Sequence, residues 1–114
     1  MEVTVKIRVI IKEPGEAVGE EVWIINSLRS LQKIVGGSIG IDTLANGSDR
    51  IVVVTDADGK LKNRTPNFRI ETMERIDVIV GTAIICGAND GGDLVSLPFD
   101  IATWRRMLRR WGNG

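Results

Sequence analysis

Four arginines near the end of the chain, Arg105, Arg106, Arg109 and Arg110, form its most concentrated group of charges. At 100° of rotation per residue they gather on one side of a helix, and the opposite side is apolar. The apolar side comprises Ile101, Trp104, Met107, Leu108 and Trp111. Because a guanidinium group donates paired hydrogen bonds that fit phosphate oxygens, the arginine stripe predicts an anion-binding surface. The same pattern is typical of a solvated helix face that complements the C-terminal dipole. A membrane-surface helix is disfavoured, because so small a core needs both tryptophans.

Two further segments carry side chains suited to ligands. Asn67, Phe68 and Arg69 place an amide, an aromatic ring and a guanidinium in sequence, a combination that can stack on a base and grip a phosphate. Phe68 in the hydrophobic core is the alternative interpretation. Asn89 and Asp90 belong to a glycine-rich stretch, residues 87–93, which could hold a cation, wrap a ligand or form only a flexible loop.

The composition excludes most catalytic chemistry. The chain has no histidine and one cysteine, Cys86, so neither a Cys/His zinc site nor a histidine-assisted nucleophile can be built. Cys86 ends an apolar run and is expected to be a small buried hydrophobe. Residues 56–59 resemble the start of a calcium loop but lack the glutamate that completes one, so a hairpin turn is expected there. We therefore predict a protein without enzymatic activity, cofactor or metal.

Length and charge set the broad class. The 114 residues, 43% of them hydrophobic, fit a single domain over residues 1–114. The 15 basic and 15 acidic side chains cancel, so no global field attracts nucleic acid or membrane. No apolar run approaches the roughly 20 residues that cross a bilayer, and the N-terminal residues alternate instead of forming a signal peptide. These features predict a cytoplasmic protein with no membrane partner.

The first half of the chain predicts two strands, a helix and a third strand. Alternating apolar residues over 3–11 indicate a strand, which Pro14-Gly15 ends before residues 22–25 pair with it as a wide hairpin. Asn26 or Ser27 caps a helix over residues 28–35, and Gly36 ends it. A strand over 38–44 follows. A helical crossover between residues 25 and 38 could make its flanking strands parallel.

The second half predicts two more strands and a final helix. Residues 51–55 form a short apolar run typical of a central strand, flanked by the turn dipeptides Asn46-Gly47 and Asp58-Gly59. Residues 60–72 are polar and predict a loop, and residues 77–86 predict one strand interrupted at Gly81. Pro98 and Asp100 open the C-terminal helix. The fold class is α+β, with a mixed, mostly antiparallel sheet of about five strands packed by two helices; a β-grasp-like order is compatible with it.

Five short motifs, in this order along the chain, resemble the family of domain of unknown function 3846. They are residues 31–37 (LQKIVGG), 58–61 (DGKL), 66–69 (PNFR), 77–82 (DVIVGT) and 96–97 (SL). The C-terminal helix departs from the family pattern through its arginine-rich face and Pro98. The resemblance implies a protein of bacteriophages, prophages and mobile elements, and it supplies no catalytic residues.

These observations predict a non-enzymatic accessory protein that sequesters a target. An anionic small molecule such as a nucleotide immune signal is the first expectation, with counter-defence as its use in the host cytoplasm. The alternatives are an inhibitor of a host protein, anchored by tryptophan and arginine side chains, and a nucleic-acid-binding module that uses the last helix. A short chain with exposed strand edges is also expected to form a homo-oligomer.

Overall fold

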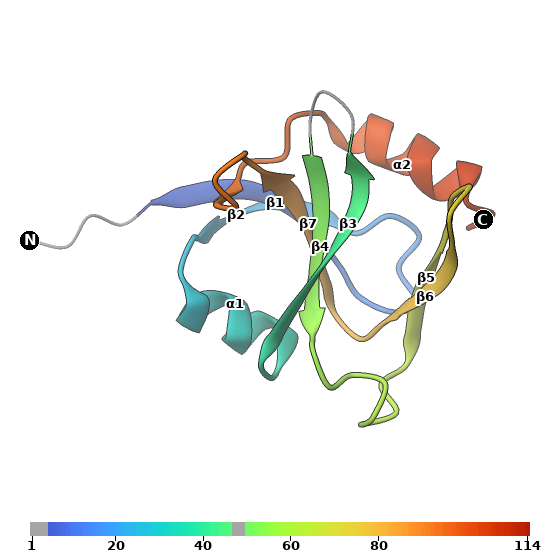
Figure 1. Cartoon of the computed structure of the whole chain (residues 1–114), viewed down its shortest axis with the longest axis horizontal. Coiled ribbons are helices and arrows are strands. Elements are labelled where there is room, and N and C mark those ends of the chain that lie inside the picture. The colour runs from blue at the N-terminus through green and yellow to red at the C-terminus, as the bar shows by residue number, and fades with distance from the viewer. Residues whose placement is uncertain (1–4, 47–49) are drawn as a thin grey trace, which may run out of the picture.

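The computed structural model describes residues 5–46 and 50–114 and has a six-stranded sheet, a two-stranded sheet and two helices (Figure 1). The N-terminal half comprises β1 (Lys6–Lys12), β2 (Glu20–Ile25), α1 (Leu28–Val35) and β3 (Ile39–Asn46). The C-terminal half comprises β4 (Arg50–Asp56), β5 (Pro66–Glu71), β6 (Ile76–Val80), β7 (Ala83–Ala88), β8 (Leu94–Val95) and α2 (Ile101–Arg110). The α+β class is therefore confirmed.

The large sheet has the strand order β2-β1-β7-β4-β3, with the short β8 attached to β7. All pairings among the described strands are antiparallel. β2 and β3 lie at opposite edges, so the parallel pair allowed by the helical crossover does not form. The crossover exists, but β1, β7 and β4 occupy the space between the two strands that it joins.

Each face of the large sheet has its own apolar core. α1 covers one face, where Leu31 and Val35 pack against Val52, Val54 and the strands beside them. α2 and the β5–β6 hairpin cover the other, where Trp104 and Leu108 pack against Ile51, Val53 and Phe68. Strand β4 supplies alternate residues to both cores, because successive side chains of a strand point to opposite faces.

The local signals for the first helix are confirmed. Ser27 is the N-cap of α1, and its Oγ accepts a hydrogen bond from the backbone N–H of Ser30 at 3.1 Å. Gly36 is the left-handed C-cap, with φ of 80°. The predicted turn at Asn46-Gly47 falls largely outside the described residues.

Three predictions for the second half are wrong. Residues 60–72 include strand β5, in which Phe68 and Ile70 are buried while Arg69 and Glu71 are exposed. Pro66 fits because it is the first residue of the strand, where no N–H is required. The hairpin turn predicted at Asp58-Gly59 is also wrong, because β4 and β5, the strands on either side of it, lie in different sheets and do not pair.

Residues 77–86 also do not form one strand. Gly81 has φ of 74° and divides the segment into β6, in the small sheet, and β7, in the large one. A side chain at position 81 would collide with Arg64, whose Cδ lies 2.8 Å from the place of a Cβ. This glycine therefore directs the chain from one sheet to the other.

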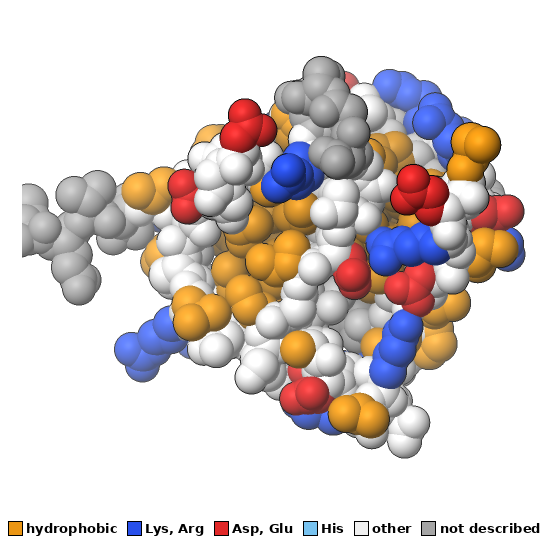
Figure 2. All heavy atoms as spheres, viewed as in Figure 1, with side chains coloured by type: hydrophobic (Ala, Val, Ile, Leu, Met, Phe, Trp, Pro, Cys, Tyr) orange, Lys and Arg blue, Asp and Glu red, His pale blue; other side chains and the backbone are white. Residues whose placement is uncertain are grey.

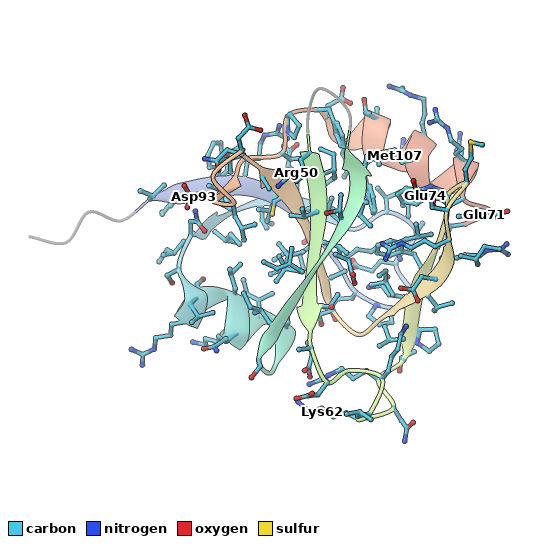
Figure 3. All side chains as sticks on the ribbon, in the orientation of Figure 1. Arg50, Lys62, Glu71, Glu74, Asp93 and Met107 are labelled. Atoms are coloured by element: carbon cyan, nitrogen blue, oxygen red, sulfur yellow. The ribbon has the colours of Figure 1, made fainter. Side chains whose placement is uncertain are left out.

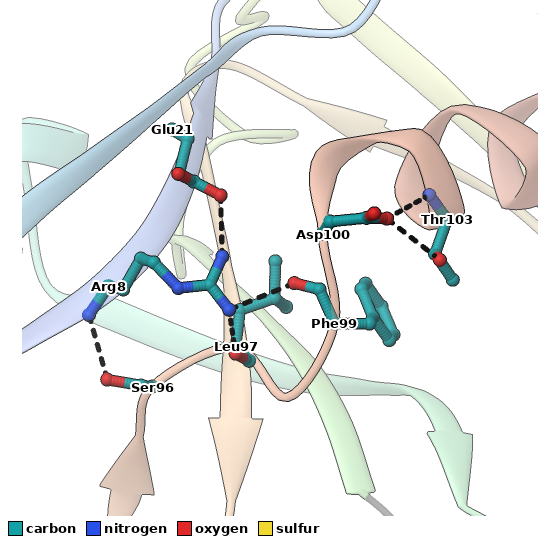
Figure 4. A network of polar contacts seen from close by, with 7 residues as sticks. All are labelled: Arg8, Glu21, Ser96, Leu97, Phe99, Asp100 and Thr103. Atoms are coloured by element: carbon teal, nitrogen blue, oxygen red, sulfur yellow. Dashed lines mark hydrogen bonds and ion pairs between the residues drawn. The ribbon is translucent and has the colours of Figure 1, made fainter.

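A network around Arg8 fixes the segment that leads into α2 (Figure 4). The Arg8 guanidinium donates to the carbonyls of Leu97 and Phe99 and pairs with Glu21 at 2.6 Å. Asp100 then caps α2, accepting a hydrogen bond from the Thr103 N–H at 2.9 Å. Strand β1 thereby sets where α2 begins.

Candidate functional site

The structure brings two of the four helix arginines together with Asn67 in one cleft of about 520 Å³. Arg105 and Arg109 line it from α2, Asn67 from β5, and Lys12 from the end of β1. The rest of the lining comes from the connection between β1 and β2, which includes Glu16, and from residues 112–114 after α2. Three segments far apart in sequence therefore converge on one basic cleft.

Trp104 holds the walls of this cleft in place. Its ring is fully buried and contacts Phe68 edge to face, with 5.4 Å between the ring centroids. Its Nε1 donates a hydrogen bond of 3.0 Å to the carbonyl of Val18, in the β1–β2 connection. The apolar face of α2 thus fixes the helix to the sheet and turns Arg105 and Arg109 toward the cleft.

The side-chain amide of Asn67 links β5 to the end of β1 and to Gly81. Its Oδ1 accepts a hydrogen bond from Lys12 Nζ at 2.7 Å, and its Nδ2 donates to the carbonyls of Lys12 and Gly81, both at 2.7 Å. Both N–H donors of the amide are therefore used within the protein. Asn67 consequently positions Lys12, and its amide has no N–H donor left for a ligand in the cleft.

Lys12 is a buried cation without a carboxylate partner. It is only 3% exposed, and its Nζ lies 5.8 Å from the centre of the Phe68 ring. Within residues 5–46 and 50–114, no carboxylate oxygen comes within 4.0 Å of this ammonium. Burial lowers the pKa of Lys12, and the charge of Glu16 opposes that shift. The cleft therefore contains an ammonium that has no direct carboxylate contact among the described residues, and Glu16, which lines the same cleft, acts on it at longer range.

The four arginines are all exposed, but only two face this cleft. Arg106 donates to Thr103 Oγ1 at 2.9 Å on its own helix. Arg110 lines a separate cleft with Met107 and Glu71. Figure 3 labels Met107 on α2 and Glu71 on the neighbouring β5–β6 hairpin. The sequence pattern correctly predicts one exposed arginine stripe. In the fold, however, Arg105 and Arg109 line one cleft, whereas Arg106 and Arg110 lie outside it.

The other predicted site residues lie apart from the cleft or are occupied. Phe68 is 3% exposed and packs between Trp104 and Trp111, so its ring belongs to the core and not to a base-stacking surface. Arg69 is exposed and pairs with Glu71 at 2.8 Å. Asn89 and Asp90 lie in the turn between β7 and β8, where Asn89 Oδ1 accepts from the Asp93 N–H.

The sequence analysis missed Lys12 as a candidate, although a signal was present. Lys12 is two residues after Ile10 and so shares the face of β1 that enters the α2-side core. A lysine on a buried face is unusual, because removing an ammonium from water is costly.

It also missed an ion cluster at Asp56. The carboxylate is 5% exposed, and its Oδ2 accepts from Lys62 Nζ and Arg64 Nε, each at 2.8 Å. Hydrogen bonds from Lys62, the Asp58 backbone and Arg64 hold the pKa of Asp56 far below its usual range. Arg64 also donates to the carbonyl of Gly36, so the cluster ties the loop after β4 to the end of α1. We assign it a structural role.

The described residues contain neither a reactive cysteine nor a cluster of metal ligands. Cys86 is fully buried, and burial raises the pKa of its thiol to about 12, as expected of a structural cysteine. No cluster of three or more potential metal-ligating side chains occurs among the described residues. In the same residues, neither helix has the length and apolarity to cross a membrane.

Comparison with known proteins identifies a family and no individual relative. No curated protein and no solved structure is significantly similar to the chain. A family model described as Domain of unknown function (DUF3846) matches residues 7–109, which include the complete cleft except its last lining residues. Because that match covers most of the 114 residues, the chain belongs to the DUF3846 family.

Proposed function

We propose that this protein binds a phosphate-bearing small molecule, without turnover, in the cleft between α2 and the end of β1. The observation that carries the proposal is the Lys12 ammonium, which is buried without a carboxylate partner and lines the same cleft as Arg105 and Arg109. An anion between these three side chains would supply a direct opposite charge, which the more distant Glu16 in the same cleft does not.

The energetics favour such a ligand. A buried charge without a counter-charge costs several kcal/mol, of the order of 3–5 kcal/mol where a partner is removed. Asn67 offsets part of this cost through one amide oxygen. A bound phosphate would offset more, because hydrogen bonds between charged groups are stronger than neutral ones. Binding should therefore raise the pKa of Lys12 and stabilise the fold.

The dimensions of the cleft suit a nucleotide or a molecule of similar size. Ligand pockets commonly measure roughly 300–1,000 Å³, and this cleft has about 520 Å³. Phe68 faces the core, so recognition depends on phosphate groups more than on base stacking. Sequestration of a nucleotide immune signal during counter-defence is the biological form of the proposal, and it fits the mobile-element setting that the family resemblance implies.

The test compares two arginine pairs on one helix. Isothermal titration calorimetry with pyrophosphate and ATP as probes measures affinity for wild type, R105Q/R109Q and R106Q/R110Q. Both variants lose the same charge, but only the first pair lines the cleft. We expect R105Q/R109Q to lose at least about tenfold in affinity, because a hydrogen bond to a charged group contributes about 1.5–3 kcal/mol. We expect R106Q/R110Q to lose less than about threefold.

Equal losses in the two variants would contradict the proposal, because they would indicate general attraction to the helix. If a duplex oligonucleotide binds better than ATP, with a steep salt dependence, the nucleic-acid alternative is favoured instead. Lys12→Met provides an independent check. It should abolish the thermal stabilisation by ligand, which for wild type is about 2.7 kcal/mol at a hundred times Kd.

A further inference from the structure

Strand β2 is an open edge of the large sheet. The Asn26 N–H donates to the Val5 carbonyl at 2.8 Å, which makes this pair a hydrogen-bonded one in the β1–β2 ladder. Hydrogen-bonded and non-bonded pairs alternate in an antiparallel ladder. The N–H and C=O groups of Glu21, Trp23 and Ile25 therefore point away from β1, toward the open side of the sheet. Of these groups, the Ile25 carbonyl already accepts a hydrogen bond from the Ser27 N–H at 3.0 Å and has one lone pair left for a further donor.

Exposed apolar side chains accompany this open edge. Trp23 is 64% exposed and Ile25 46%, and both project from the face of β2 opposite the buried Ile24. Val5 and Leu28, at the end of β2 where α1 begins, are also more than half exposed. Large apolar side chains next to free backbone groups favour pairing with another strand.

The other edge strand, β3, is protected against such pairing. Arg75 donates to the carbonyl of Thr43 at 3.1 Å, and its Nη1 lies 3.8 Å from Asp42 Oδ1. A bulge interrupts the register between Thr43 and Ala45. Figure 2 shows acidic and basic side chains intermixed on this side of the molecule. Charges and bulges are devices that blunt a sheet edge. On β2 the charged residues Glu20 and Glu21 lie only at its first end, and its register with β1 has no bulge.

We propose that β2 pairs antiparallel with β2 of a second copy of this chain, about a two-fold axis at Ile24. In this register Trp23 lies opposite Ile25 of the partner, and Ile25 lies opposite Trp23 of the partner. The outward-pointing backbone groups of both strands then form hydrogen-bonded pairs. Aromatic and β-branched residues directly opposite each other stabilise a strand pair, so the strand is complementary to itself.

The distribution of charge along β2 also favours pairing with a second copy of the chain. β2 begins with the exposed acid Glu20, whereas the exposed bases Lys6 and Arg29 lie near its other end. Two-fold antiparallel pairing brings the acidic end of one strand to the basic end of the other. It also keeps the acids of the two copies far apart. A register centred on Val22 would instead bring the two copies of Glu21 close together, which like charges disfavour.

The first experiment measures mass and tryptophan exposure over a concentration series. Each chain has a mass of 12.5 kDa, so light scattering should give twice that value for wild type. Trp23→Lys should give a single chain. The matched control, Ile41→Lys, alters a residue of similar exposure on β3 and should stay dimeric. Trp104 and Trp111 are buried, so acrylamide quenching reports on Trp23 and should fall as the dimer forms.

The second experiment tests the register with engineered cysteines. An oxidised mixture of Trp23→Cys and Ile25→Cys chains should form a disulfide-linked heterodimer, because residues opposite each other have Cα atoms about 5.5 Å apart. Neither variant alone should crosslink efficiently. The native Cys86 is fully buried and stays out of the reaction.

Several results would overturn this inference. A single-chain mass for wild type at about 100 μM would exclude the dimer, because a β-edge interface of this kind should persist there. A dimer that survives Trp23→Lys, or one lost with Ile41→Lys, would place the interface elsewhere. Efficient crosslinking of Trp23→Cys alone would refute the register centred on Ile24.

Discussion

Replacing Asn67 with alanine should destabilise the protein even when no ligand is present. The amide joins three parts of the fold, since it bonds the Lys12 ammonium, the Lys12 carbonyl and the Gly81 carbonyl, each at 2.7 Å. Alanine removes all three contacts together. Of the hydrogen bonds that the ammonium makes to described residues, this leaves the weaker one, to the Asn67 carbonyl at 3.4 Å.

The expected magnitude follows from these contacts. A buried polar group that loses its partner costs about 1–3 kcal/mol, and more if it is charged. Three groups lose their partner here, and at about 1 kcal/mol for each, with somewhat more for the charged ammonium, we expect a total loss of about 3–4 kcal/mol. Unfolding of a domain of this size shifts by roughly 4 °C for each kcal/mol, so the melting temperature should fall by about 12–16 °C.

Urea denaturation at pH 7, followed by circular dichroism, measures the loss directly. Arg69→Ala is the matched control, because Arg69 is a neighbouring exposed residue whose side chain pairs, within the described part of the chain, with the exposed Glu71 alone. It should cost less than about 1 kcal/mol. In the Lys12→Met background, Asn67→Ala should cost markedly less, because the buried charge is gone. If Asn67→Ala loses less than about 1 kcal/mol, Asn67 does not support Lys12 and this account of the cleft is wrong.

Two further predictions concern groups outside the cleft. The folded-state pKa of Asp56 is lowered, chiefly by Lys62, so its stabilising contribution is present above the unfolded pKa of about 3.9 and is lost as pH falls below it. The urea midpoint of wild type should thus fall more steeply between about pH 5 and 2 than that of Asp56→Asn, and parallel curves would show that the ion cluster contributes nothing. The Cys86 thiol has a pKa raised to about 12 by burial, so a disulfide reagent at pH 8 should label the native protein more than about a hundredfold more slowly than the protein in urea. Equal labelling rates would mean that the middle of the large sheet is open to solvent.

Sequence patterns that span a few residues correctly predicted much of the secondary structure. The alternation over residues 3–11, of which 3 and 4 lie outside the described residues, predicted β1. Asn26 or Ser27 and Gly36 marked the ends of α1, and Pro98 and Asp100 marked the start of α2 to within a few residues. Each of these signals works locally, through strand period or capping hydrogen bonds. The exposed arginine stripe opposite Trp104 and Leu108 followed from the same local geometry.

Sequence patterns failed where tertiary contacts outweigh local preference. Residues 66–71 appeared too polar for a strand, but burial of Phe68 and Ile70 against α2 stabilises β5. Gly81 was predicted only to interrupt one strand, yet its positive φ and the packing of Arg64 against it separate two sheets. Period and composition cannot indicate which sheet a strand joins, because that depends on segments far away in the sequence.

The cleft itself depends on the tertiary structure alone. The sequence showed that the chain has arginines able to bind an anion and lacks the histidines and paired cysteines of common catalytic sites. It could not show that Arg105 and Arg109 face Lys12 while Arg106 and Arg110 do not. Lys12 and Asn67 are 55 residues apart, and they meet because β1 and the β5–β6 hairpin pack together beneath α2. Local chemistry thus determined which side chains are available, and long-range packing decided which of them share one site.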